Sequence, residues 1–462
     1  MSSSLKFGTS GLRGLAAELA GIEARRYAAA FVRYAATDVP LQVLVGRDLR
    51  DSSPQIATDV MAAVTALGFK AVDCGLLPTP ALALEAMREA CPAIMVTGSH
   101  IPGDRNGLKF YRYTGEIDKA DEAGILRHLG DAPSEPVAAA VDPRALQRYR
   151  DRCLRFLPKR ALTGWRVGVW QHSSVLRDLL GEVLAAYGAE VVPLGRSDVF
   201  IAVDTEAVSA VAQAELAGWV RAHRLDALVS ADGDGDRPLL VDEHGAFVRG
   251  DMIGILAAQF LHAGTVVTPV TSNSAIDSMS GFNRVVRTRV GSPYVIAAMM
   301  QASTAGEGTV VGFEANGGVL LGNDVDLNGS IVEALPTRDA MLPILAVLGA
   351  ARAAAMTVGE LVATLPAREA RSDRLEDVPA EASARLIEML TSYADEFLAP
   401  QGTIASHSDI DGPRFVLASG DVIHYRPSGN APELRCYTEA STAARANELL
   451  AWGLAAAAAV VR

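Results

Sequence analysis

A pattern of apolar and polar positions recurs three times along the first three quarters of the chain. Each copy has an apolar strand, a polar turn, an amphipathic helix that ends at glycine, and a second short apolar strand. The first strands are LQVLV, RVGVW and TVVTPV, and the copies end with ALGFKAVDCG, AYGAEVVPLG and MSGFNRVVRT. Gly68, Gly188 and Gly281 lie where each helix should close in a left-handed conformation, which glycine adopts without steric cost. Repeated strand–helix–strand units predict α/β domains with largely parallel sheets.

The pattern changes near Leu365, where the chain becomes charged. The stretch REARSDRLEDVPAEASARL lacks the strand–helix repeat and is typical of a linker that leads into a domain of different construction. We therefore expect an α/β protein of three related domains with mixed, largely parallel sheets, followed by a distinct α+β C-terminal domain. The expected boundaries are 1–150, 151–250, 251–365 and 366–462.

Composition narrows the classes of protein to which the chain could belong. Half of the 462 residues are apolar, which is enough for several hydrophobic cores. The net charge of -12 and the absence of a Lys/Arg run argue against a nucleic-acid partner. The four cysteines lie far apart, without zinc-site spacing, as in a reduced cytosolic protein. No secretory signal opens the chain, and no segment has the ~20 apolar residues of a membrane span, so we expect a cytoplasmic protein without a membrane partner.

Three aspartates alternate with glycine in the segment SADGDGDRPLLVD. Asp232, Asp234 and Asp236 follow the apolar stretch LDALVS, and the glycines between them allow three carboxylates to converge on one point. A hard divalent cation with oxygen ligands suits this arrangement, although a solvated acidic turn has the same composition. The segment therefore predicts a metal site.

A calcium-binding EF-hand loop is an alternative for the same segment, because Glu243 falls at the twelfth position of such a loop. Arg237 occupies the sixth position, where the EF-hand turn requires glycine, and the flanking segments are expected to be strands rather than helices. Three carboxylates on a short turn also leave coordination positions for phosphate and water. Magnesium is therefore the expected ion.

A second candidate segment, AIMVTGSHIPGDRNGLKFY, joins an apolar strand to a Gly/Pro-rich loop that contains Ser99 and His100. A serine on such a loop can act as a nucleophile if a metal or a base assists its ionisation, although most loop serines are turn residues or helix caps. Only five of the 42 basic residues are lysines. Lys109, at the end of this segment, therefore indicates a role for a titratable amine, such as general acid/base catalysis. The chain has no Gly-x-Ser-x-Gly motif of a hydrolase.

The segment HYRPSGNAPELRCY has the groups of a phosphate cradle. Arg426 and Arg435 flank a turn, and the arginine forks could act together with hydroxyl, amide and backbone N–H groups. The turn residues are Ser428, Gly429 and Asn430. A surface turn between two strands is the alternative.

The segment VVGFEANGGVLLG places Glu314 and Asn316 side by side in a Gly-rich turn. A carboxylate next to an amide can accept from and donate to vicinal hydroxyls, so a sugar is a natural ligand. A hairpin loop without a ligand is the alternative.

Taken in order, these segments resemble the α-D-phosphohexomutase family, whose members include phosphomannomutases and phosphoglucomutases. The resemblance covers nearly the whole chain, since FGTSGLRG, GRDLRDSSP and GLLPTP precede the four loops described above. The four loops in this order and at domain-sized intervals make the resemblance specific. It implies three related α/β domains and a fourth distinct one around a central cleft, in agreement with the repeat pattern.

The resemblance also implies a role for each candidate residue. Ser99 would carry a phosphoryl group and, with Asp232, Asp234 and Asp236, hold Mg²⁺. Lys109 would be the general acid/base, with His100 beside it in the catalytic loop. The remaining candidates would line the catalytic cleft or hold the substrate: Arg13, Arg237, Glu314, Asn316, Arg426, Ser428, Gly429, Asn430 and Arg435.

The implied reaction transfers the phosphoryl group of Ser99 to a hexose phosphate and takes the other phosphate back from a hexose 1,6-bisphosphate, which must also prime the enzyme. Many members have Glu-x-Ser-Gly-His in the sugar loop, whereas this chain has glycine at 318 and lacks the histidine contact. The EANGG form is more similar to phosphomannomutases, which implies interconversion of mannose 6-phosphate and mannose 1-phosphate. A phosphoglucomutase or a dual-specificity enzyme is the alternative.

Two other classes of function are compatible with parts of this set. A metal-dependent sugar-phosphate phosphatase would pass the phosphoryl group to water, and a sugar-phosphate sensor would not need the complete set of Ser99, Lys109 and three aspartates. The expected partner is a hexose phosphate, and the protein is expected to be a monomer or a homodimer. In the segment WQHSSVLRD, we expect Ser173 or Ser174 to be a helix N-cap.

Overall fold

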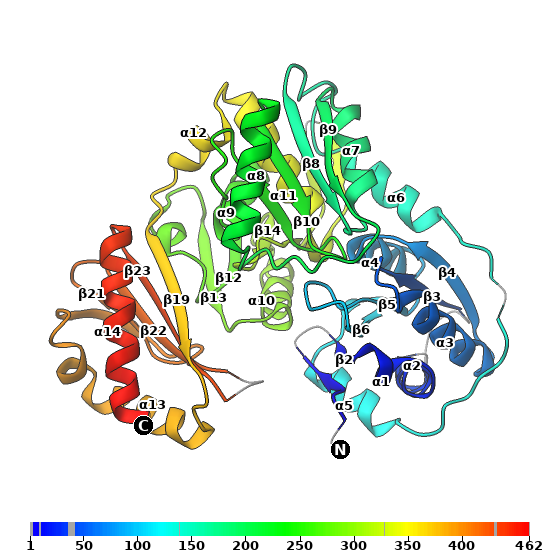
Figure 1. Ribbon diagram of the computed structural model, residues 1–462, viewed down its shortest axis with the longest axis horizontal. Coiled ribbons are helices and arrows are strands. Elements are labelled where there is room, and N and C mark those ends of the chain that lie inside the picture. The colour runs from blue at the N-terminus through cyan, green and yellow to red at the C-terminus, as the bar shows by residue number, and fades with distance from the viewer. Residues whose placement is uncertain are drawn as a thin grey trace. The chain divides into compact units, whose positions relative to one another are not determined.

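The computed structural model describes residues 3–8, 11–35, 42–137, 139–327, 329–428 and 432–461 (Figure 1). It separates into two compact units. The first unit comprises Met1–Val267, Phe282–Arg284 and Gly291–Thr364, and the second comprises Thr268–Gly281, Val285–Val290 and Leu365–Arg462. The predicted division into four domains, with boundaries near 150, 250 and 365, stays a prediction.

The first sheet is mixed and has the order β1-β2-β6-β5-β3-β4, with β7 paired to β6. Strands β4, β3 and β5 are parallel, whereas β6 pairs antiparallel with β5, β2 and β7. Strands β3 and β5 are apolar and buried because helices cover both faces of the parallel part of the sheet. Helices α2 and α3 contribute Phe31 and Ile56 to the core beneath these strands. The elements are β1 (Lys6–Phe7), β2 (Leu12–Leu15), α1 (Ala16–Leu19), α2 (Ile22–Ala35), β3 (Gln42–Arg47), α3 (Ser53–Ala66), β4 (Lys70–Leu76), α4 (Thr79–Arg88), β5 (Ala93–Val96), β6 (Arg105–Arg112), β7 (Gly115–Glu116) and α5 (Lys119–Arg127).

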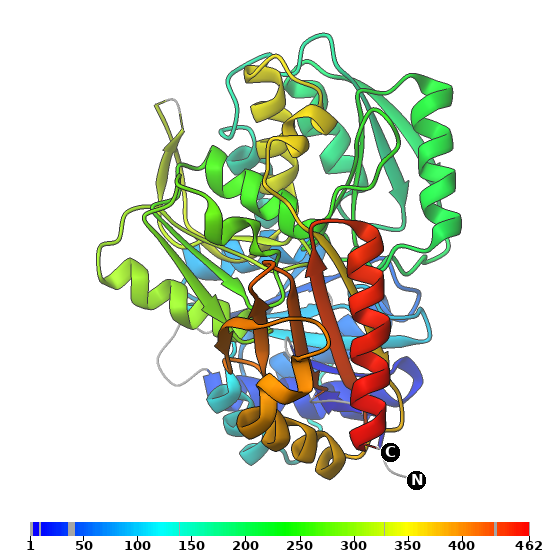
Figure 2. The same ribbon diagram turned by 90° about the vertical axis from the view of Figure 1, so that its left-hand side faces the viewer.

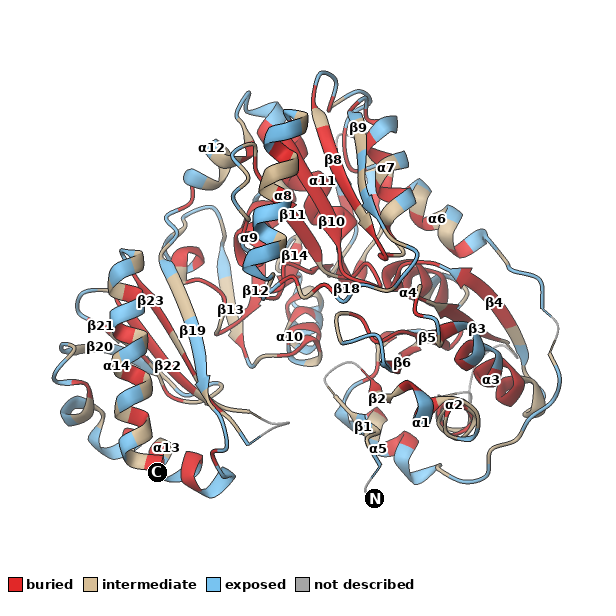
Figure 3. Cartoon of the chain, in the orientation of Figure 1, coloured by how far each residue is buried: buried red, intermediate tan, exposed pale blue. Residues whose placement is uncertain are grey.

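The second sheet has the order β11-β10-β8-β9. Strands β9, β8 and β10 are parallel, and β11 returns antiparallel to β10. Figure 3 shows β8 and β10 buried along most of their length and the outer face of α8 exposed. The elements are α6 (Arg144–Cys153), β8 (Arg166–His172), α7 (Arg177–Ala186), β9 (Glu190–Arg196), α8 (Ala210–His223), β10 (Ala227–Ala231) and β11 (Pro238–Val241).

The third sheet has the order β13-β12-β14-β15-β18, beside a two-stranded ribbon of β16 and β17. Strands β12 and β14 are parallel, whereas β15 pairs antiparallel with both β14 and β18. The elements are α9 (Gly250–Phe260), β12 (Thr265–Pro269), the 3₁₀ helix η1 (Ser274–Ser278), β13 (Arg284–Thr288), α10 (Ser292–Thr304), β14 (Val310–Phe313), β15 (Val319–Leu321), β16 (Val325–Leu327), β17 (Ser330–Val332), β18 (Leu335–Asp339), α11 (Met341–Ala353) and α12 (Val358–Ala363).

The C-terminal part of the second unit is an antiparallel sheet of order β19-β23-β22-β21-β20, with two long helices. Helix α14 runs alongside this sheet (Figure 2) and buries Leu449 and Ala457 in its core. The elements are β19 (Glu369–Leu375), α13 (Ala380–Leu398), β20 (Ile404–Ser408), β21 (Arg414–Leu417), β22 (Val422–Pro427), β23 (Leu434–Ala440) and α14 (Ala443–Val461). The predicted fold class, α/β sheets followed by an α+β domain, is confirmed.

The third strand–helix–strand copy departs from the prediction. Gly68 and Gly188 have φ of 82° and 89° as expected, but Gly281 does not have a positive φ. The expected amphipathic helix before Gly281 is the short 3₁₀ helix η1. The segment TSNSAIDSMS that forms it is short and rich in Ser and Asn, whose side chains compete for backbone hydrogen bonds and so disfavour a longer helix.

The predicted N-cap at Ser173 or Ser174 is also wrong. Helix α7 begins at Arg177, and Leu176 is its N-cap residue. The Ser174 hydroxyl instead donates to the Asp232 carbonyl at 2.7 Å, and the Ser173 hydroxyl accepts from the Ile201 N–H at 2.7 Å. Ser173 therefore holds a neighbouring loop, whereas Ser174 holds the Asp232 backbone and also accepts the Leu176 N–H at 3.2 Å, in the turn that leads into α7.

Among the described residues, no helix is long and apolar enough to cross a membrane.

Candidate active site

Ser99 lies in the loop that follows β5, at a strained point of the backbone. Its φ of 55° is in the left-handed region, which a non-glycine residue enters at a cost of about 1–2 kcal/mol. The Thr97 hydroxyl accepts the Ser99 N–H at 2.8 Å, and the serine is 1% exposed. The Ser99 hydroxyl donates to Asp232 Oδ2 at 2.6 Å, across 133 positions of sequence. The structure therefore brings the predicted nucleophile to the predicted metal loop.

Arg50 holds this loop in place. Its Nη2 donates to the carbonyl groups of Ser99 at 2.9 Å and Ile101 at 2.7 Å, while its Nη1 donates to those of Pro102 and Arg105. The guanidinium is fully buried, and the Asp48 carboxylate accepts from its Nε at 3.2 Å. Four of its hydrogen bonds are made to backbone carbonyls of one loop, so Arg50 fixes the path of the chain around Ser99.

The motif GRDLRDSSP contributes to the family resemblance, but no role was predicted for Arg50. The glycine at 98 offers an after-the-fact signal, because a Cβ there would lie 2.7 Å from the Arg50 guanidinium carbon. A buried arginine and a glycine without room for a side chain thus form one packing unit.

The three aspartates lie on the turn between β10 and β11. Asp232, Asp234 and Asp236 are all buried, and one carboxylate oxygen from each lies within 4.8 Å of the others. Oδ1 of Asp234 and Oδ1 of Asp236 are buried and accept no hydrogen bond within the described ranges. A cluster of three buried carboxylates, two of which keep an oxygen without a hydrogen bond, fits a hard divalent cation.

Two neighbouring loops support this turn. The Thr79 hydroxyl donates to the Asp234 carboxylate, and the Thr79 N–H donates to the Asp234 carbonyl at 2.9 Å. The Ser174 hydroxyl binds the Asp232 carbonyl from another side. Outer contacts of this kind orient the groups that bind a metal.

Burial and neighbouring charges shift the pKa values of Asp232 and Asp236 in opposite directions. Burial, reinforced by Asp234 and Asp236, raises the pKa of Asp232 well above its usual value. Burial acts the same way on Asp236, but the nearby charges of Arg338 and Lys109 outweigh it and lower the pKa of Asp236. Without a cation, Asp232 therefore holds a proton more readily than Asp236.

Lys109 on β6 lies among the aspartates. Its Nζ donates to Asp234 Oδ2 at 2.6 Å and to Asp236 Oδ2 at 2.7 Å. Burial lowers the pKa of the Lys109 amine, but the charges of Asp234 and Asp236 more than compensate, so the pKa is raised. Lys109 is therefore an ammonium in this arrangement.

His100 and two arginines complete the surroundings of Ser99. His100 Nδ1 lies 3.3 Å from the Ser99 hydroxyl, and burial, with the charges of Arg237 and Arg13, lowers the pKa of His100 to about 2. Burial foremost, and then Arg237, lowers the pKa of Arg13 to about 10. Arg237 Nε is buried, has no hydrogen-bond partner within the described part of the chain, and lies 3.8 Å from Asp236 Oδ1. His100 is therefore neutral beside the Ser99 hydroxyl, while the two arginines supply positive charge.

The predicted sugar loop lies between β14 and β15, and both of its candidate residues are buried. Glu314 Oε2 accepts from Arg338 Nη1 at 2.9 Å. Asn316 Oδ1 accepts the Gly318 N–H at 3.0 Å, so this oxygen closes the turn. Arg338 lies on β18, outside every motif that the sequence singled out, and was missed.

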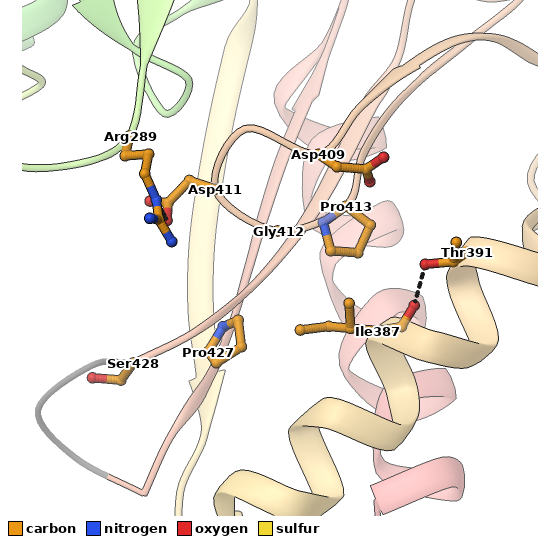
Figure 4. Close-up of a pocket in the computed structure, with 9 residues that line it drawn as sticks. All are labelled: Arg289, Ile387, Thr391, Asp409, Asp411, Gly412, Pro413, Pro427 and Ser428. Carbon is orange, nitrogen blue, oxygen red and sulfur yellow. Dashed lines mark hydrogen bonds and ion pairs between the residues drawn. The ribbon is translucent and has the colours of Figure 1, made fainter. Parts of the chain in front are cut away.

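The predicted phosphate loop lies in the second unit beside a cavity of about 490 Å³ (Figure 4). Ser428 and Arg289 line this cavity together with Asp411. Arg426 donates to Asp411 Oδ2 at 2.6 Å, and Arg289 lies 3.6 Å from Asp411 Oδ1. The predicted residues Gly429 and Asn430 lie outside the described residues.

Arg435 lies directly opposite Arg426 in the β22–β23 register and pairs with Glu433 at 3.3 Å. Two arginines facing each other across strands repel unless carboxylates offset their charges. Asp411 and Glu433 do so here. Arg289 was not among the predicted residues.

Comparison with known proteins gives consistent results. Models of phosphoglucomutase/phosphomannomutase α/β/α domain I, α/β/α domain III and the C-terminal domain match residues 4–134, 249–368 and 367–451. A phosphomannomutase from Sinorhizobium fredii is 48% identical over 97% of this chain and 98% of its own, and one from Salmonella muenchen is 43% identical over 95% and 93%. The structure of a phosphoglucomutase/phosphomannomutase family protein from Burkholderia thailandensis aligns with a TM-score of 0.77 at 20% identity, covering 98% of each chain. The chain belongs to the phosphoglucomutase/phosphomannomutase family, as its loops indicated.

Proposed function

We propose that the protein is a phosphomannomutase, which interconverts mannose 6-phosphate and mannose 1-phosphate through a phosphorylated Ser99. The observation that carries the proposal is the hydrogen bond of 2.6 Å between the Ser99 hydroxyl and Asp232, within a buried triad of aspartates that also contacts Lys109. Relatives 43–48% identical over nearly the full chain are named phosphomannomutases, which supports the choice of mannose.

Asp232, Asp234 and Asp236, with an oxygen on Ser99, would hold Mg²⁺. When bound, the ion would neutralise charge on the phosphoryl group in transit. The four residues are buried and the three carboxylates already lie close together, so little reorganisation is needed at the moment of transfer. Arg13 and Arg237 would add positive charge around the same phosphoryl group.

In the forward step, the bond between the Ser99 oxygen and phosphorus breaks, and a bond from phosphorus to a hydroxyl oxygen of the bound hexose phosphate forms. The hydroxyl proton passes to Lys109, which must first be neutral. A cation on Asp234 and Asp236 would offset the carboxylate charges that raise the pKa of Lys109 and so favour the neutral amine. On the return step, the Ser99 oxygen forms a bond to the other phosphorus of the bisphosphate and passes its proton to Asp232, which accepts from the Ser99 hydroxyl at 2.6 Å. The bond from that phosphorus to the hexose oxygen breaks, and the hexose oxygen takes its proton from Lys109.

The remaining site residues would hold the sugar and its second phosphate. Glu314 and Asn316 would bind the sugar hydroxyls. The phosphate that is not transferred would bind at the cavity of the second unit, which Arg289 and Ser428 line. The other residues proposed to hold this phosphate are Arg426, Gly429, Asn430 and Arg435. A hexose 1,6-bisphosphate, the intermediate of the reaction, would also prime the enzyme by phosphorylating Ser99.

Burial of Ser99 favours a mutase over a phosphatase. At 1% exposure, the Ser99 side chain has little access to water that could hydrolyse a phosphoserine. A phosphatase would instead need water to reach the phosphoserine.

The four cysteines at 74, 91, 153 and 436 are free and buried, which supports the proposal that the protein works in the reducing cytoplasm. Whether it is a monomer or a homodimer stays a prediction.

The proposed activity can be tested with purified protein, Mg²⁺ and a catalytic amount of hexose 1,6-bisphosphate. Mannose 1-phosphate and glucose 1-phosphate are supplied separately, and the 6-phosphate products and free phosphate are measured together. We expect mannose 6-phosphate without free phosphate, at a higher rate than glucose 6-phosphate. A higher rate with glucose would make the protein a phosphoglucomutase, and free phosphate without an isomer would make it a phosphatase.

A further inference from the structure

Arg338 joins two loops that have separate roles in the proposed function. Its side chain is 3% exposed. Nη1 donates to Glu314 Oε2 in the sugar loop at 2.9 Å. Nε and Nη2 donate to Asp236 Oδ2 in the metal loop at 3.1 and 3.0 Å. One rigid guanidinium therefore touches the carboxylates of both loops.

These contacts determine which oxygen of Asp236 is free. Asp236 Oδ2 accepts from Arg338 and from Lys109, whereas Oδ1 is the buried oxygen without a hydrogen bond. Arg338 and Lys109 thus hold Asp236 through Oδ2 and leave Oδ1 available to a ligand. In the same way, Arg338 fixes Glu314 through Oε2.

Gly318 provides the space that Arg338 fills. A Cβ at position 318 would lie 2.8 Å from Arg338 Cδ, 2.9 Å from Arg338 Cγ and 2.8 Å from the Asp236 carbonyl oxygen, too close for any real side chain. The backbone at Gly318 is not in the left-handed region, so space rather than conformation demands glycine here. The histidine that many family members carry at this position therefore could not coexist with Arg338 as it is placed in this chain.

We infer that Arg338 is a positioning residue that orients Asp236 for the cation and Glu314 for the hexose at the same time, in the space left by Gly318. The inference rests on the proposed function, because it assigns the cation and the hexose to these two loops. It predicts that a change at Arg338 weakens the binding of Mg²⁺ and of the hexose phosphate together, because Arg338 acts through Asp236 and Glu314.

The test measures binding by isothermal titration calorimetry in a Ser99→Ala background, which prevents turnover. Mg²⁺ is titrated alone, and mannose 6-phosphate is titrated at saturating Mg²⁺. For Arg338→Lys, which keeps the charge but loses the planar fork, we expect both affinities to fall by about tenfold or more, as for other groups that orient metal ligands. Gly318→Ala keeps Arg338 in the chain, but its Cβ would press on both Arg338 and the Asp236 carbonyl, so it should weaken binding of Mg²⁺ and of mannose 6-phosphate.

Arg152→Lys is the matched control. Arg152 is also buried and pairs with Asp339, the residue after Arg338, at 3.0 Å, but it belongs to no site loop. Its replacement should lower the melting temperature to a similar extent and leave both affinities unchanged. The inference is overturned if Arg338→Lys changes the two affinities no more than Arg152→Lys does, or if it weakens only one of them.

A double-mutant cycle sharpens the link to the sugar loop. Glu314→Gln should lower the affinity for mannose 6-phosphate and leave the affinity for Mg²⁺ unchanged. Combined with Arg338→Lys, the loss of hexose phosphate affinity should be smaller than the product of the two separate losses; independent losses would contradict the inference. The mutase assay of the wild type tests the proposed function separately, and that function fails if no isomerase activity is found. Even then, a loss of both Mg²⁺ and mannose 6-phosphate affinity in Arg338→Lys would still support the role of Arg338.

Discussion

The surroundings of Ser99 and the cavity beside Ser428 both hold groups for a phosphate, but they are built differently. Around Ser99, Arg50 and Lys109 are almost completely buried and each contacts fixed backbone carbonyls or carboxylates. Beside Ser428, the side chains of Arg289 and Arg426 are 59% and 18% exposed and share a single carboxylate, Asp411. A phosphoryl group in transit needs preorganised charges, whereas a phosphate that is only held must also be released so that the bisphosphate can turn.

This difference predicts that changes around Ser99 act on kcat and changes beside Ser428 act on KM. Interactions made only in the transition state affect kcat, while those made equally before and during transfer affect KM.

The largest contrast is expected for Arg50→Met, which removes the support of the Ser99 loop without touching the substrate. We expect kcat to fall by about a hundredfold because Ser99 leaves its strained position, with little change in KM. Stability should fall by about 3–5 kcal/mol, since Asp48 is left buried without its partner.

Kinetics at a temperature where the variant is folded would measure this effect, with Arg152→Met as the control for loss of a buried arginine pair. If the two variants lose kcat equally, the Ser99 loop does not depend on Arg50 in particular.

The buried aspartates predict a pH dependence that the exposed cavity lacks. The raised pKa of Asp232 means that the folded, metal-free protein holds a proton that Mg²⁺ must displace. Mg²⁺ affinity should therefore rise with pH, by up to about tenfold per unit, until the pH exceeds that raised pKa. The free energy of unfolding of the metal-free protein should change with pH in the opposite direction. A carboxyl whose pKa is raised by folding stabilises the fold at low pH, and this stabilisation is lost as the pH rises through the raised pKa.

Calorimetry with Mg²⁺ between pH 5 and 8, in buffers of different ionisation enthalpy, would count the released protons. Asp232→Asn should remove the pH dependence together with most of the affinity. An affinity independent of pH in the unaltered protein would contradict the assigned direction of the Asp232 pKa.

The smallest effect is expected for Arg426→Gln, which removes the arginine bound to Asp411 at the edge of the cavity. Loss of one charge-assisted hydrogen bond to the held phosphate should raise KM by about tenfold, and kcat should change little. Steady-state kinetics with mannose 1-phosphate measures both. Arg414→Gln on the neighbouring strand β21 is a control outside the predicted loop, and a fall in kcat for Arg426→Gln would remove the contrast between the two regions.

Local pattern was sufficient for the features that depend on neighbouring residues. The alternation of Asp and Gly at 232–236 and the Gly/Pro-rich loop at Ser99 could be recognised in the sequence, as could helix ends at Gly68 and Gly188. The α-helix predicted in the third repeat was wrong. The apolar strands of this repeat are similar to those of the other two, but the polar segment between them is too short and too rich in serine for an α-helix.

Contacts between distant segments could not be predicted in this way. Arg338 meets Asp236 across 102 positions and lies on an ordinary strand, where nothing local distinguishes it from a surface arginine. Ser174 has the sequence setting of an N-cap, and only the folded structure brings it to the Asp232 carbonyl. In both cases, the partner is determined by the packing of separate sheets and loops rather than by sequence spacing.

The central claim is that Ser99 carries the phosphoryl group, and intact-mass spectrometry of the protein after incubation with hexose 1,6-bisphosphate and Mg²⁺ tests it most directly. We expect one phosphate, located on Ser99 by peptide mapping, that is lost to mannose 6-phosphate with formation of the bisphosphate. Ser99→Ala should take up no phosphate and lose at least about 10⁴-fold in kcat while still binding mannose 6-phosphate. Phosphate on another residue, or turnover by Ser99→Ala near the wild-type rate, would contradict the account.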